Sequence, residues 1–114
     1  MIAPQHRDLA GGRWHQLSLS EQLGNVGSEI SRAIRWSDRN ADLASGAFHR
    51  ALELLDLTLA DARLRQQPWR LREIARAREV VVDFFAGSNE YRSTAESLQK
   101  YFDAFALAAR ARRG

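Results

Sequence analysis

The segment from Arg63 to Phe85 reads RLRQQPWRLREIARAREVVVDFF and joins a basic stretch to an apolar one. Its first sixteen residues hold six arginines and a single acid, Glu73, and its end carries three valines and two phenylalanines. Apolar residues recur every three or four positions from Ile74, and Pro68 stands where a first helical turn tolerates its missing N–H. The segment therefore predicts a helix from about residue 68 to 85, with one buried face and a row of arginines beside it.

Three further segments show the apolar periodicity of a helix. The first follows Ser18-Leu-Ser-Glu21, an S-x-x-E capping box, and the last follows Ser93-Thr-Ala-Glu96, which has the same pattern. Between them, residues 41–64 carry an apolar face wide enough to pack against two neighbours. Four helices joined by short loops predict an all-α fold, an antiparallel up-down-up-down four-helix bundle over residues 18–114.

Residues 1–17 are predicted as an N-terminal tail, flexible by default, as chain ends are. Pro4 and the pair Gly11-Gly12 interrupt regular structure, whereas Trp14 and Leu17 could fix the segment to the body. Inside the first predicted helix, Gly24 and Gly27 flank the apolar stripe. Because glycine weakens a helix interior, we expect another backbone or a bulky ring to pack closely there.

Composition restricts the class of protein. With 114 residues and 45% hydrophobic content, the chain forms one globular domain. It has no run of eighteen apolar residues and no signal-peptide pattern, so we expect neither a membrane span nor export. The absence of cysteine excludes disulfides and thiolate metal sites and fits a cytoplasmic protein.

The charge is unevenly distributed although the net charge is only +3. Arginines concentrate in residues 63–78 and at the C-terminus, and Trp69 adds a ring that could stack on a base. The alternative is a solubilising surface, in which Trp69 packs under the bundle and the arginines pair with Glu73, Glu79 and Asp83. The candidate nucleic-acid-binding residues are Arg63, Arg65, Trp69, Arg70, Arg72, Arg76, Arg110, Arg112 and Arg113.

Three residues of the helical patterns suggest contacts of another kind. Leu57 and Leu64 fall outside the apolar stripe of their segment, which indicates a second contact surface. The spacing of Arg78 places it on the apolar face of its helix, where an arginine needs a partner. That partner is either a carboxylate of this chain (Glu53, Asp56 or Asp61) or a group across an oligomer interface.

No arrangement of side chains predicts catalysis. His49, Glu53 and Asp56 share one helix face, but that face points away from the core, which favours a solvated surface over a metal site. The chain has no G-x-S-x-G motif and no histidine four to six residues after an arginine. We therefore expect a protein without catalytic residues, metal or cofactor, and not an enzyme.

Most of the chain resembles a set of small prokaryotic four-helix-bundle proteins with no assigned activity. The similar segments are WHQLSLSEQLGNVGSEISRAIRW, ALELLDLTLAD and REVVVDFFAGSNEYRSTAESLQKYFDAFALAAR. In layout the chain is also similar to proteins encoded in 23S rRNA intervening sequences and to the accessory protein of diversity-generating retroelements. That resemblance implies a homo-oligomer that binds nucleic acid beside a reverse transcriptase, with Leu57, Leu64 and Leu107 as oligomer contacts.

The sequence thus supports two hypotheses. In the first, a non-enzymatic bundle uses its arginine-rich helix face to bind RNA or DNA as an accessory subunit of a larger complex. In the second, the same face binds an acidic protein, as an adaptor or an antitoxin-like partner would.

Overall fold

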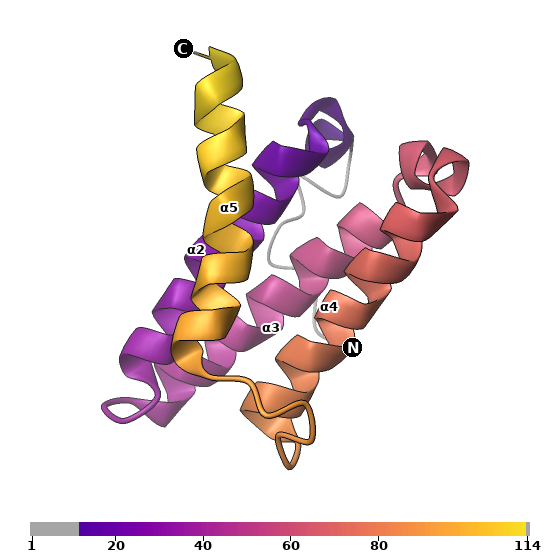
Figure 1. Ribbon diagram of the computed structural model, residues 1–114. Coiled ribbons are helices and arrows are strands. Elements are labelled where there is room, and N and C mark those ends of the chain that lie inside the picture. The colour runs from indigo at the N-terminus through magenta and orange to yellow at the C-terminus, as the bar shows by residue number, and fades with distance from the viewer. Residues whose placement is uncertain (1–11, 114) are drawn as a thin grey trace.

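The computed structural model describes residues 12–113, in which four α-helices run alternately up and down (Figure 1). They are α2 (Leu19–Trp36), α3 (Ala41–Leu59), α4 (Pro68–Ala86) and α5 (Ala95–Arg113). Two short 3-10 helices, η1 (Arg13–Gln16) and η2 (Ala62–Gln66), precede α2 and α4. The predicted all-α, antiparallel four-helix bundle is confirmed.

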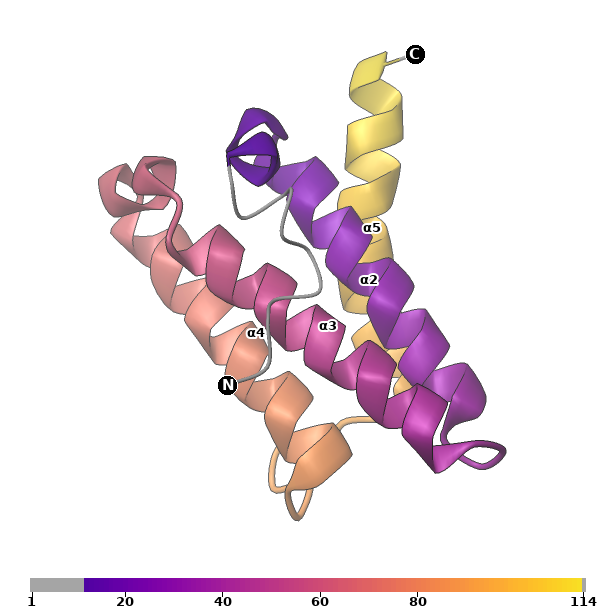
Figure 2. The same cartoon turned by 180° about the vertical axis from the view of Figure 1, so that it is seen from behind.

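Helix α2 is the central element, because both α3 and α5 pack along it. Helix α4 instead packs against α3 and η2 and comes close to α5 at few points. Figure 2 shows the same arrangement from behind, with α4 on the far side of α3 from α2 and α5. Long side chains bridge α4 and α5: the Tyr101 hydroxyl donates to Glu73 Oε2 at 3.0 Å.

The core lies mainly between α2, α3 and α5. It is built from the apolar stripes that the periodicity predicts, and α4 adds its share through Ile74 and Val81. The remaining buried members of this core cluster are Trp14, Leu23, Val26, Ile30, Ala51, Leu54, Leu55, Leu98 and Phe102. Since apolar burial drives folding, this cluster fixes the register of the helices and thereby the position of every surface residue.

The two glycines of α2 permit close contact with α5. A Cβ atom on Gly27 would lie 2.9 Å from Phe102 Cβ, and one on Gly24 would lie 3.2 Å from Ala106 Cα. Both distances are shorter than ordinary van der Waals contact. The predicted close-contact surface is therefore confirmed, and its neighbour is α5.

Two helix ends differ from the sequence expectation. The second helix does not run to residue 64: α3 ends at Leu59, and Asp61 caps η2 by accepting the Arg63 N–H at 3.0 Å. At the start of α5, Thr94 caps the helix instead of Ser93. The Thr94 hydroxyl accepts the Ser97 N–H and the Ser97 hydroxyl accepts the Thr94 N–H, both at 2.9 Å. The capping box of Ser18 and Glu21 forms as predicted.

Trp14 belongs to the core although it lies in the segment predicted as a tail. Its ring is buried, and its Nε1 donates to the hydroxyl of Thr58 on α3 at 3.0 Å. Leu17 packs against the same core. These contacts hold residues 12–17 against the bundle, and residues 1–11 of the predicted tail lie outside the described part of the chain.

Candidate nucleic-acid interface

Three of the six arginines in residues 63–78 are held by carboxylates of the same chain. Arg63 Nε donates to Asp61 Oδ1 at 3.0 Å, and Arg70 Nη1 donates to Glu73 Oε1 at 2.7 Å. Arg78 Nε donates to Asp56 Oδ1 at 2.7 Å, so Asp56 is the partner among the three candidate carboxylates. Arg78 is half-buried, and Asp56 supplies the carboxylate partner that its guanidinium requires within the same chain.

The other three arginines are exposed and have no carboxylate partner within residues 12–113. Arg65 lies on η2, and Arg72 and Arg76 lie on α4. On α4, Trp69, Arg72 and Arg76 follow the spacing i, i+3 and i+7, which places them along one side of the helix, and Arg65 precedes them on η2. We call Arg65, Trp69, Arg72 and Arg76 the α4 stripe.

Trp69 projects from the α4 stripe and does not pack under the bundle. Its side chain is 56% exposed, the opposite of the buried cap considered as an alternative. The guanidinium carbon of Arg70 lies 4.4 Å from the Trp69 ring centroid, within the range of a cation–π contact. Arg70 therefore packs over the ring, and more than half of Trp69 still remains exposed to solvent.

The acids expected to neutralise the α4 stripe are used elsewhere. Asp83 accepts the backbone N–H groups of Glu90 and Tyr91 at 2.8 and 3.0 Å. Glu79 accepts the Tyr91 hydroxyl at 3.0 Å. Both carboxylates thus bind the loop between α4 and α5, and Arg76 has no carboxylate partner in the described part of the chain.

The same loop places a second exposed ring at the end of the α4 stripe. Tyr91 is 45% exposed, and the Arg76 guanidinium lies 5.7 Å from its ring centroid. The hydrogen bond to Glu79 raises the pKa of the Tyr91 hydroxyl above its ordinary value. Sequence reasoning did not predict Tyr91, since only its position on the folded loop brings it to Arg76.

The C-terminal arginines do not extend the α4 stripe as a block. Arg110 lies in a groove between α2 and α5, whereas Arg112 faces a cavity beside Gln67 and Arg70 at the start of α4. Both are exposed. The side chain of Arg113 lies outside the described part of the structure.

The predicted oligomer contacts have different surroundings. The expectation for Leu64 is wrong, because η2 turns this residue into the core and leaves it 2% exposed. Leu57 is half-buried and packs against the core cluster. Leu107 is 60% exposed on α5 and can contact a partner.

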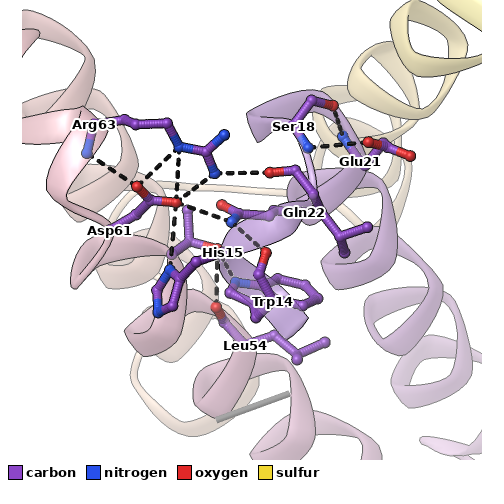
Figure 3. Close-up of polar contacts among 10 residues, drawn as sticks. Trp14, His15, Ser18, Glu21, Gln22, Leu54, Asp61 and Arg63 are labelled. Atoms are coloured by element: carbon purple, nitrogen blue, oxygen red, sulfur yellow. Dashed lines mark hydrogen bonds and ion pairs between the residues drawn. The ribbon is translucent and has the colours of Figure 1, made fainter. Parts of the chain in front are cut away.

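A buried polar cluster joins η1, α2, α3 and η2 (Figure 3). Gln22 Nε2 donates to Trp14 O at 2.9 Å and to Asp61 Oδ2 at 3.1 Å. Arg63 holds the pKa of Asp61 well below its usual range, more strongly than burial raises it. The cluster did not emerge from sequence reasoning, although a glutamine on the apolar side of α2, three residues after Leu19, was a signal.

Other kinds of site have little support in residues 12–113. No group of three His, Cys, Asp or Glu side chains could hold a metal ion there. The ring Nδ1 of His49 lies 2.8 Å from the carbonyl oxygen of Ser45, on an exposed face. None of the helices in this range has the length and apolarity to cross a bilayer.

Comparison of the chain with protein-family models, curated proteins and solved structures found no match. The structure is that of a small four-helix protein. The resemblance to prokaryotic four-helix-bundle proteins is therefore a prediction, and the functional assignment rests on the geometry of the α4 stripe.

Proposed function

We propose that the protein binds single-stranded nucleic acid through the α4 stripe, as a non-enzymatic accessory subunit of a larger complex. The observation that carries this proposal is the row of Arg65, Arg72 and Arg76, which have no carboxylate partner within residues 12–113, around an exposed Trp69. Unpaired guanidinium groups bind phosphates, and an exposed indole stacks on an unpaired base.

The exposed rings support single strands over duplexes. Trp69 lies among the arginines of the α4 stripe and Tyr91 lies beside Arg76 at its end, and a base can reach these rings only when it is unstacked from its neighbours. The predicted resemblance to a retroelement accessory protein points to nucleic acid of either kind and would add a reverse transcriptase as a partner.

The proposal is tested by the salt dependence of binding to a mixed-sequence single-stranded oligonucleotide, followed by fluorescence anisotropy. We expect the double variant Arg72→Ala/Arg76→Ala to bind more weakly and to reduce the slope of log K against log salt by about 1.4, roughly 0.7 per phosphate contact. Trp69→Ala should weaken binding by about 1–3 kcal/mol without changing that slope.

The matched control is Arg39→Ala, in the loop between α2 and α3. Arg39 is exposed, has no side-chain partner among the described residues and lies outside the α4 stripe. Its variant should bind like the wild type. No binding by the wild type at low salt, or equal losses in Arg39→Ala and Arg72→Ala/Arg76→Ala, would reject the proposal.

A protein partner is the second candidate, and one observation favours it. A cavity of about 240 Å³ with an almost wholly apolar lining lies between α4 and α5. Val80, Leu98 and Tyr101 are among the residues that line it, together with the charged side chains of Glu73 and Arg76. An acidic amphipathic helix would match both the apolar cavity and the charge of Arg76. Its binding would depend less steeply on salt concentration than the binding of nucleic acid.

A further inference from the structure

A polar cavity of about 300 Å³ lies at the end of the bundle where α2 and α4 begin and α5 finishes. Its volume falls within the range of small-molecule sites. Its polar lining includes Ser20, Gln22, Asp61, Arg63, Arg70 and Arg112. None of these residues belongs to the α4 stripe, so the cavity is a separate site.

Two buried polar atoms without a hydrogen-bond partner belong to residues that line this cavity. Within residues 12–113 these are Gln22 Oε1 and Arg70 Nε, one acceptor and one donor. Gln22 is fully buried, and its amide nitrogen is engaged by Trp14 O and Asp61 Oδ2, as Figure 3 shows. Those two acceptors fix the orientation of the amide and leave Oε1 without a donor within residues 12–113.

The charges around the cavity favour an anion. Three of its lining residues are arginines and one is an acid, Asp61, which Arg63 already binds. Arg112 has no partner among the described residues, and Arg70 uses only Nη1 for Glu73. The first N–H groups of α2, at Leu19 and Ser20, also remain without intrahelical acceptors at the cavity wall.

We propose that this cavity binds a phosphomonoester carried on a sugar. A phosphomonoester has a charge of about −1.5 to −2 at pH 7 and three acceptor oxygens, enough for both Arg112 and the N–H groups of Arg70 that Glu73 does not use. Its oxygens accept from Arg70 and Arg112, and a sugar hydroxyl donates to Gln22 Oε1. A ligand of this chemistry is either a free sugar phosphate or the 5′-phosphorylated end of a nucleic-acid strand.

Titration calorimetry and NMR of the whole chain test this inference. The probes are ribose 5-phosphate, ribose, succinate and one oligonucleotide with either a 5′-phosphate or a 5′-hydroxyl. We expect ribose 5-phosphate to bind, to shift the side-chain resonances of Gln22 and Arg70, and to bind about ten- to hundredfold more weakly to Arg112→Gln. Arg39→Gln is the matched control and should bind as the wild type does.

The outcomes separate the two sources. Binding of ribose 5-phosphate supports the free ligand. A preference for the 5′-phosphorylated oligonucleotide that disappears in Arg112→Gln supports the strand end, even when ribose 5-phosphate does not bind. The inference is overturned if neither phosphate probe shifts the Gln22 amide, or if succinate or ribose binds equally well. Because Arg72→Ala/Arg76→Ala leaves this cavity intact, failure here is distinguishable from failure of the α4 stripe.

Discussion

Asp61 connects three parts of the chain through one side chain. Its carboxylate accepts from the Arg63 guanidinium and the Gln22 amide, and His15 Nδ1 lies 3.4 Å from Oδ2. These contacts explain why a nearly buried carboxyl remains ionised: the hydrogen bond from Arg63 lowers its pKa more than burial raises it.

This pKa shift makes stability depend on pH. The pKa of Asp61 is lower in the folded protein than its ordinary value of 3.8. The ionised carboxylate therefore stabilises the folded state well above pH 4, and this contribution to the free energy of unfolding is lost progressively as pH falls below that value. We expect Asp61→Asn to destabilise the protein by about 2 kcal/mol at pH 7 and by much less at pH 2.5. Urea denaturation of both proteins from pH 7 to pH 2.5 measures the difference, and a constant difference would contradict the assignment.

The same residues show where sequence reasoning ends. The spacing of the arginines alone predicted a helix with an arginine-rich face. Which arginines remain unpaired was not, because Asp83 and Glu79 are drawn to the loop around Tyr91 by contacts seven to twelve residues away. The burial of Trp14 likewise depends on Thr58, 44 residues along the chain.

At the scale of helices, glycine has opposite effects in α2 and α3. Gly27 faces Phe102 on α5 with no room for a methyl group, whereas the nearest atom to a Cβ on Gly46 is Nη1 of Arg50, at 3.4 Å, an ordinary contact distance. Alanine favours a helix by about 1 kcal/mol over glycine wherever there is space for it. The two sites therefore form a matched pair.

We expect Gly27→Ala to destabilise the protein by about 1–3 kcal/mol, because α5 has to move away from α2. Gly46→Ala should stabilise it by up to about 1 kcal/mol. Thermal unfolding followed by circular dichroism compares the two variants with the wild type. If both variants gain stability, α5 does not pack on α2 as closely as the structure shows.

Helix starts were more predictable than helix ends. The S-x-x-E pattern and Pro68 marked the beginnings of α2 and α4, since capping depends on neighbouring residues. The end of α3 was not marked, because the leucines of residues 52–64 continue a helical pattern through Asp61. There the cap of η2 and the buried cluster outweigh local propensity.

For the whole molecule, Leu107 is the exposed member of the predicted oligomer contacts. We expect light scattering to give a mass of two or more chains of 12.9 kDa each, and Leu107→Ser to lower that mass. Leu43→Ser, at another exposed leucine, is the control and should leave the mass unchanged. A wild-type monomer at high concentration would contradict the expectation of an oligomer.

Helix α4 carries the stripe yet packs less extensively than the other helices, because it contacts α3 and η2 only sparsely while α2 holds both α3 and α5. An element anchored on one side opens at a lower free energy than the core around it. A ligand that binds such a helix reduces its local fluctuations. The conformational entropy lost in this way offsets part of the attraction between guanidinium groups and phosphates. A companion subunit that clamped α4 in place would remove that entropic cost and so make the two binding events cooperative.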